Sequence, residues 1–175
     1  MGYLIISCSL NPKSRSRVLA RNAQNYLEDI KEKTMWIDLA QIDFPMCDGN
    51  SVYSLPMVDE MRKLVNDAEG ILMACPIYNY DLSAAAKNFV ELTGGTWQEK
   101  VVGFLCAAGG DNSYMSPMSF ANSLMLDFRC IVIPSFVYAS PRSFSENNDI
   151  TPEIRERIKE LVNKLVRISR ALKET

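Results

Sequence analysis

The sequence predicts an α/β fold in which helices cover both faces of a parallel sheet. Short apolar runs alternate with amphipathic helical patterns along the 175 residues, which is the order that βαβ units produce. The runs 71–75 and 101–106 are apolar throughout, apart from one glycine, as strands buried on both faces are. These observations predict a three-layer sandwich that forms a single domain over residues 1–175.

The first half of the chain contributes two strands and two helices to this prediction. Strands are expected at 3–8 and 34–39, where apolar residues are concentrated. The first helix carries its apolar residues at Leu19, Ala23, Tyr26, Leu27 and Ile30. The second helix carries them at Val58, Met61, Leu64, Val65 and Ala68. Because the spacings are three and four residues, each set lies on one helix face, which we expect to pack against the sheet.

The second half contributes three strands and three helices. Strands are expected at 70–75, 100–107 and 130–138, and helices at 83–92 and 116–128. The last helix opens with Thr151 and Pro152, a capping residue followed by proline at the first helical position. Residues 144–149 precede it and are expected to form a solvated loop.

The composition narrows the classes of function. Basic and acidic residues number 19 and 21 and are interspersed, so we expect no nucleic-acid partner. The longest apolar run, 101–108, is far shorter than the roughly 20 residues that span a bilayer, and we expect neither a membrane partner nor a signal peptide. Five scattered cysteines without a C-x-x-C pair favour a reducing, cytoplasmic location.

The absence of histidine is informative about chemistry. A chain with no histidine lacks Ser-His-Asp and Cys-His catalysis and most types of zinc site. We therefore expect no catalytic side chain and no metal ion, and we expect a cofactor to supply the chemistry.

Three loops that follow predicted strands carry the candidate site. In a parallel sheet of order 2-1-3-4-5, the first, third and fourth strands end near the point where the strand order reverses, and ligands bind there. The first loop leads into a helix start, whose free N–H groups favour phosphate. Its hydroxyl groups belong to Ser9, Ser14 and Ser16, and its charged groups to Lys13, Arg15 and Arg17.

The other two loops suit a flat ring system. The second contains Pro76, Tyr78, Asn79 and Tyr80, which offer aromatic rings and an amide that both donates and accepts hydrogen bonds. The third contains Ala108, Gly109 and Gly110, where paired glycines let the backbone approach a ligand closely. Together the three loops predict a site for a planar, phosphorylated ligand.

These loops resemble those of the NADPH-dependent FMN reductase family, which includes azoreductase-type and quinone-reducing members. Residues 7–20 match the family's Gly-Ser-x-Arg-x-x-Ser loop in length and in its two serines. Pro76-Ile77-Tyr78-Asn79 resembles the family's Pro-Glu-Tyr-Asn, and 108–110 its double-glycine loop. The chain has Cys8, Asn11 and Ile77 where the family pattern has glycine, arginine and glutamate.

The resemblance implies a flavodoxin-like sandwich with a five-stranded parallel sheet in the order 2-1-3-4-5. It implies an FMN-dependent oxidoreductase that passes hydride from NADPH or NADH through bound FMN to a small acceptor such as a flavin, a quinone, an azo compound or a metal ion. It also implies a homodimer or homotetramer. The residues expected to bind FMN are Ser9, Asn11, Ser14, Arg15, Ser16, Pro76, Tyr78, Asn79, Tyr80, Ala108, Gly109 and Gly110.

Alternatives to these assignments stay open from the sequence. The chain could be an FMN-binding electron carrier, or a flavodoxin-like module without catalytic activity. Ser14 or Ser16 could simply cap the first helix, and Arg15 and Arg17 could be surface charges. Cys8 could be a reactive thiol beside a helix start, whereas the other strand cysteines, Cys75, Cys106 and Cys130, are expected in the core.

Overall fold

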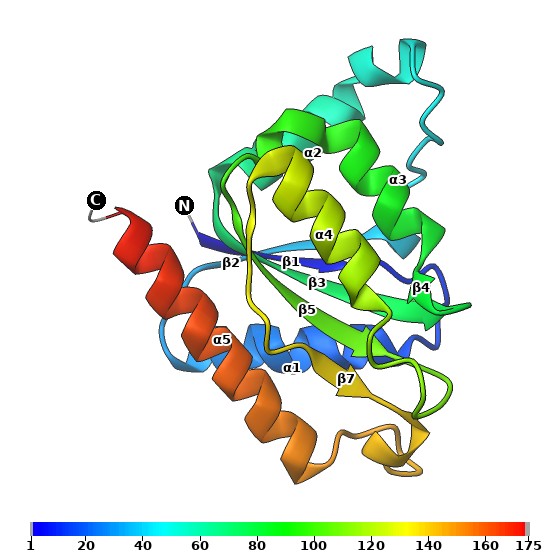
Figure 1. The fold of residues 1–175 in the computed structure, drawn as a ribbon, viewed down its shortest axis with the longest axis vertical. Coiled ribbons are helices and arrows are strands. Elements are labelled where there is room, and N and C mark those ends of the chain that lie inside the picture. Colours follow the sequence, from blue (N-terminus) through cyan, green and yellow to red (C-terminus); the bar gives the residue numbers. More distant parts are fainter. Residues whose placement is uncertain (1, 174–175) are drawn as a thin grey trace.

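A computed structural model describes residues 2–173 and arranges them in three layers. A central sheet is covered on one face by α1 and α5 and on the other by α2, α3 and α4 (Figure 1). The helices are α1 (Arg15–Asp29), α2 (Pro56–Asp67), α3 (Ala84–Thr93), α4 (Pro117–Phe128) and α5 (Pro152–Lys173). The predicted α/β sandwich is therefore confirmed. None of the helices formed by residues 2–173 combines the length and the apolar character needed to cross a bilayer.

Four long strands form the parallel centre of the sheet. They are β2 (Thr34–Asp38), β1 (Gly2–Ser7), β3 (Ala68–Tyr78) and β5 (Val101–Ala107), in that spatial order. This is the predicted order 2-1-3-4. Every residue of β1 and β5 is buried, as the continuous apolar runs indicated. Ala68 begins β3, whereas it was expected on the face of the second helix, because that helix ends at Asp67.

The predicted fifth strand is divided in two, which corrects the expectation of five strands. Residues 130–138 contain β6 (Ile131–Val132) and β7 (Val137–Ala139), and both pair in parallel with β5. Pro134 lies between them, and proline has no N–H to donate to the neighbouring strand. The edge strand is consequently interrupted there.

A short antiparallel strand, which the sequence did not predict, lies at the end of β3. Tyr78 pairs with Asp81 and Ile77 with Leu82, so β4 (Asp81–Leu82) folds back on β3. Asn79 and Tyr80 form the connection, and both have positive φ, 51° and 63°. These values are typical of a two-residue type I′ hairpin turn.

The segment before α5 also differs from its expected solvated loop. Phe144 is 9% exposed and packs with the cluster formed by α1 and α5. It forms a bridge with Ile150 across the loop, while residues 145–147 remain exposed. The loop is therefore anchored at its first residue by burial of an aromatic ring.

Candidate functional site

The three predicted loops meet at the carboxyl ends of β1, β3 and β5, where they line two adjoining cavities. The first cavity measures about 430 Å³, and the predicted residues that line it are Ser9, Asn11, Ser14, Arg15, Ser16, Pro76, Tyr78, Ala108 and Gly109. The second measures about 360 Å³ and is lined by Asn79, Tyr80, Gly109 and Gly110, together with residues 111–113. Ile77 and Gly109 border both cavities. The structure thus brings all twelve sequence-predicted residues to one end of the sheet.

At the first cavity, α1 begins with an N-cap. Ser14 Oγ accepts a hydrogen bond from the backbone N–H of Arg17 at 3.1 Å, and it lies 2.9 Å from Ser16 Oγ. The capping role proposed for Ser14 is therefore confirmed. The backbone N–H groups of Arg15 and Ser16 precede the first intrahelical bonds and have no acceptor within the helix. They lie at the positive end of the helix dipole, beside the cavity that these residues line.

Two further side chains shape the first loop. Ser9 Oγ accepts from the Asn11 N–H at 3.3 Å, and Asn11 Oδ1 accepts from the Lys13 N–H at 2.9 Å. The second contact is an Asx turn. Within residues 2–173, the described bonds use the acceptor oxygens of both side chains and leave the Ser9 hydroxyl and the Asn11 amide as donors.

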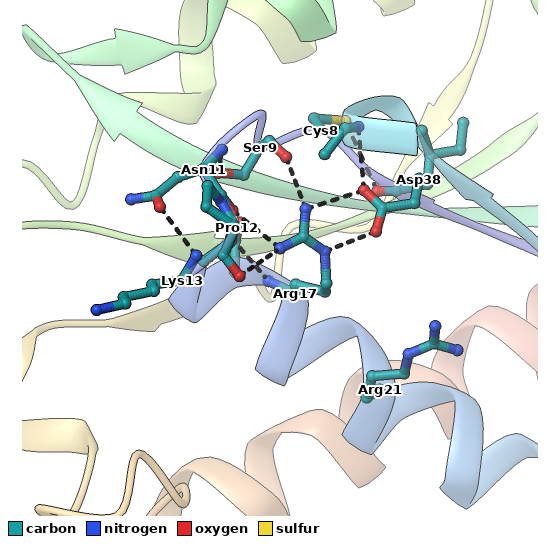
Figure 2. A network of polar contacts seen from close by, with 12 residues as sticks. Cys8, Ser9, Asn11, Pro12, Lys13, Arg17, Arg21 and Asp38 are labelled. Carbon is teal, nitrogen blue, oxygen red and sulfur yellow. Dashed lines mark hydrogen bonds and ion pairs between the residues drawn. The ribbon is translucent and has the colours of Figure 1, made fainter. Parts of the chain in front are cut away.

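Arg17 holds the first loop from behind, a role that the sequence did not reveal. Its guanidinium donates to Asp38 Oδ2 at 2.6 Å and to Asp38 Oδ1 at 3.0 Å (Figure 2). It also donates to the carbonyls of Ser9, Asn11 and Pro12, at 3.0, 2.9 and 3.3 Å. The interpretation of Arg17 as a surface charge is wrong, because this side chain is only 18% exposed and fully engaged.

Arg15 lies differently from Arg17. It is exposed, it lines the first cavity, and its guanidinium stands 5.2 Å from the centre of the Phe144 ring. Because Asp38 neutralises Arg17, the positive charge that borders the cavity belongs to Arg15 and Lys13.

The hairpin between β3 and β4 presents the aromatic side of the site. Tyr78 and Tyr80 are 53% and 68% exposed. Asp81 holds the hairpin, because its Oδ1 accepts from the Leu82 N–H at 2.7 Å and from the Ser119 hydroxyl of α4 at 3.0 Å. A tyrosine with φ of 63° adopts a backbone conformation that favours glycine.

The glycine loop is held by a tyrosine from the edge of the sheet. The Tyr138 hydroxyl of β7 donates to the Gly110 carbonyl at 2.5 Å. It accepts from the Ser113 N–H at 3.3 Å and, since its one proton is already used, from the Ser113 hydroxyl at 2.7 Å. Tyr138 and Ser119 act on the site from outside the motifs, which is why sequence reasoning missed them.

The cysteines below the site are core residues. Cys8, Cys75 and Cys106 are fully buried on one face of the sheet. Burial raises the pKa of Cys75 well above its usual range, and the neighbouring Cys8 raises it further; burial likewise raises the pKa of Cys106. The reactive-thiol interpretation of Cys8 is wrong, since no part of this residue is exposed.

Comparison with known proteins bears on the identity of this site. Residues 1–145 match the model of a family described as NADPH-dependent FMN reductase. The sequence is 29% identical to the NAD(P)H-dependent FAD/FMN reductase of Geobacillus thermodenitrificans, over 78% of this chain and 76% of that protein. It is 30% identical to the probable NADPH:quinone oxidoreductase 2 of Oryza sativa subsp. japonica, over 90% of this chain and 83% of that protein.

Solved structures show the same fold at low sequence identity. RosB, in a structure with bound 8-demethyl-8-formylriboflavin-5'-phosphate, superposes with a TM-score of 0.82 at 17% identity, over 99% of this chain and 80% of RosB. A flavodoxin from the domain Archaea superposes with a TM-score of 0.68 at 14% identity, over 97% of this chain and 99% of the flavodoxin. The predicted flavodoxin-like architecture is confirmed by this likeness.

Proposed function

This chain belongs to the NADPH-dependent FMN reductase family, and from that membership we propose that its two adjoining cavities together hold one FMN. The protein is an FMN-dependent oxidoreductase that takes electrons from NADPH or NADH. When bound, FMN supplies the hydride chemistry, and the protein supplies binding, orientation and electrostatics. A small molecule such as a flavin, quinone, azo compound or metal ion then accepts the electrons.

One observation supports this placement above the others. The loops that end β1, β3 and β5 line cavities that share Ile77 and Gly109, so a phosphate group and a ring system can be held by adjacent walls of one site. The space beside the glycines is open, because a Cβ built on Gly109 or Gly110 meets no heavy atom within 4 Å.

Each part of the site has a distinct task in this proposal. The phosphate lies at the start of α1, where it accepts from the N–H groups of Arg15 and Ser16 and from the Ser9 hydroxyl. Asn11, Ser14 and Lys13 shape that loop. Tyr78 and Pro76 pack near the ring, and the backbone N–H groups of Gly109 and Gly110 stabilise negative charge at its edge.

The chain needs no catalytic acid or base for this reaction. It has no histidine, and the electron transfer occurs between cofactor, nicotinamide and acceptor. The protein's own contribution is to orient the flat partners against each other, with Tyr80 at the exposed mouth of the second cavity. We propose that this mouth admits the nicotinamide and the acceptor in turn.

The first test is the visible absorption spectrum of the purified protein, before and after addition of FMN and desalting. Flavin bands that survive desalting are the expected result. A colourless protein that retains no FMN would contradict the placement of FMN in these cavities.

Asn11 and Ile77 stand where the family has arginine and glutamate, which favours an electron carrier as the second candidate function. Anaerobic addition of NADPH or NADH to the flavin-loaded protein separates the two. We expect either nicotinamide to reduce the bound FMN, so that the visible flavin absorption is lost. If the flavin stays oxidised with both nicotinamides yet is reduced by dithionite, the protein is a carrier.

We also propose that the chain forms a homodimer through α4. The exposed apolar residues of this helix and the loop before it are Tyr114, Met115, Met118, Met125 and Leu126. The same helix also contributes Phe120 and Phe128 to the wall of a cavity of about 500 Å³ between α3 and α4. Exposed apolar groups of this kind mark association surfaces.

Because all five cysteines are free thiols, we propose a cytoplasmic location.

A further inference from the structure

Arg17 is bound tightly to the first loop, yet it does not border the cavity that the loop forms. The first cavity is lined by Ser9, Asn11 and Ser16 but not by Arg17. Arg17 instead lines a second hollow of about 310 Å³, together with Val18 and Arg21 of α1. This hollow shares only Lys13 and Ser14 with the first cavity. The guanidinium therefore lies behind the loop rather than inside the site.

The guanidinium of Arg17 has no donor left for a ligand. An arginine side chain carries five N–H donors, and the hydrogen bonds of Arg17 to Asp38 and to three carbonyls number five. Its charge is compensated by the Asp38 carboxylate, which is 1% exposed. A buried carboxylate of this kind requires its partner, so the guanidinium is not free to turn toward the cavity.

These contacts set the direction of the loop's peptide groups. In a trans peptide, the carbonyl and the following N–H point in opposite directions. Since the carbonyls of Ser9 and Pro12 point at Arg17, the N–H groups of Leu10 and Lys13 point away from it. The Lys13 N–H is then bound by Asn11 Oδ1, which closes the turn.

We propose that Arg17 and Asp38 are a positioning pair, which holds residues 9–12 in the shape that binds the FMN phosphate without touching the phosphate. The inference rests on the proposed function of the site. Asp38 ends β2 and its Oδ1 also accepts from the Ala40 N–H at 3.2 Å. The loop is therefore fixed to the sheet through a side chain whose own position is determined by a strand end.

Replacement of Asp38 shows whether Arg17 positions the loop or attracts the phosphate directly, because the two roles change the affinity for FMN in opposite directions. A carboxylate near a phosphate repels it, so its removal should strengthen binding if Arg17 attracts the phosphate directly. In a positioning pair, Asp38→Asn replaces an acceptor oxygen with an NH2 donor that faces the guanidinium, so the loop loses its anchor. The proposal therefore requires weaker FMN binding after a negative charge has been removed.

The experiment titrates the purified apoprotein with FMN and with riboflavin, which lacks the phosphate, and follows quenching of flavin fluorescence. The variants are Arg17→Lys, which cannot donate five bonds in a plane, and Asp38→Asn. The control is Arg21→Lys, one turn further along α1, where the guanidinium stacks 3.6 Å from the Trp36 ring centre and donates to Gln24 Oε1 of the same helix. Thermal unfolding of each variant reports whether the fold is intact.

We expect the Kd for FMN to rise about tenfold or more in both variants, the loss expected for hydrogen bonds between charged groups, and the Kd for riboflavin to change less than about threefold. Arg21→Lys should leave both values unchanged. Equal losses for FMN and riboflavin would overturn the proposal, as would tighter FMN binding in Asp38→Asn. If Arg17→Lys does not fold, the proposal is decided by whether Asp38→Asn raises or lowers the Kd for FMN.

Failure of the inference is distinguishable from failure of the proposed function. If the unmodified protein binds FMN and the variants bind it equally well, the positioning role is wrong and the site stands. If the unmodified protein binds neither flavin, the proposed FMN site itself is wrong.

Discussion

At the residue scale, the two glycines of the third loop line the candidate site without a side chain of their own. Gly109 and Gly110 do not have the left-handed backbone that requires glycine. A Cβ at either position would meet no neighbouring atom of the protein. Neither conformation nor packing therefore explains why these residues are glycines. The open space beside them belongs to the two cavities that they line.

Gly109→Ala is accordingly expected to separate binding from stability. The added methyl group should raise the Kd for FMN about tenfold, because it occupies ligand space, while the unfolding free energy stays level or rises by about 0.5 kcal/mol. Flavin titration and thermal unfolding measure the two effects. Gly95→Ala is the matched control, since a Cβ there also meets no atom, and it lies in η3 (Gly94–Trp97). Loss of stability in Gly109→Ala alone would contradict this account.

At the element scale, the hairpin between β3 and β4 shows a conflict between local backbone preference and the residue present. Type I′ turns favour Asn-Gly, and this turn is Asn79-Tyr80 with positive φ at both residues. A left-handed tyrosine costs about 1 kcal/mol relative to glycine. The Asp81–Ser119 bond to α4 helps to hold the turn in place. The aromatic ring is kept at the cavity mouth despite this cost.

Tyr80→Gly should therefore stabilise the fold and impair the enzyme. We expect the unfolding free energy to rise by roughly 0.5–1 kcal/mol, and the KM for a quinone acceptor to rise about fivefold because an aromatic contact is lost. Lys31→Gly is the control, because Lys31 also has positive φ, 66°, and is exposed at the end of α1. It should give a similar gain in stability with no change in KM. An unchanged KM in Tyr80→Gly would remove this residue from the acceptor site.

The same hairpin shows which parts of the fold could be predicted from the sequence and which could not. Continuous apolar runs and helical spacings predicted the long strands, the five helices and the three loops of the site, because these signals are local. The order of the strands in the sheet was predicted from the resemblance to a family with a flavodoxin-like fold. The turn at Asn79-Tyr80 lacks the glycine that marks such hairpins, so β4 was missed. Arg17 and Asp38 are 21 residues apart, and only the parallel pairing of β1 with β2 brings them together. An ion pair between residues so far apart in the sequence leaves no local pattern from which it could be predicted.

At the scale of the whole molecule, the candidate site and the group that affects stability at alkaline pH lie at opposite ends of the sheet. The site lies at the carboxyl ends of the strands, whereas Tyr3 is buried near the start of β1. Burial raises the pKa of Tyr3 to about 12, and the carboxylates of Glu32 and Glu69 contribute. Since the folded state holds this proton more tightly than the unfolded state, Tyr3 stabilises the fold below about pH 10, and that contribution is lost as the pH rises toward 12.

Tyr3→Phe should remove this part of the alkaline loss. We expect the unfolding free energy of the native sequence to fall more steeply between about pH 9 and about pH 11 than that of the variant, as measured by urea denaturation at both values. Tyr26→Phe, which removes a hydroxyl bonded to Asn163 on the molecular surface, should retain the full loss. Parallel curves for the native sequence and Tyr3→Phe would show that the Tyr3 proton does not govern alkaline unfolding.

The interrupted edge of the sheet has a consequence for how this protein behaves at high concentration. A long edge strand offers a row of unpaired N–H and C=O groups on which a second chain can add as another strand. One edge of this sheet consists of β6 and β7, only two and three residues long, and Pro134 stands between them without an N–H. A second chain finds no continuous row of N–H and C=O groups there, so this break opposes growth of the sheet at that edge.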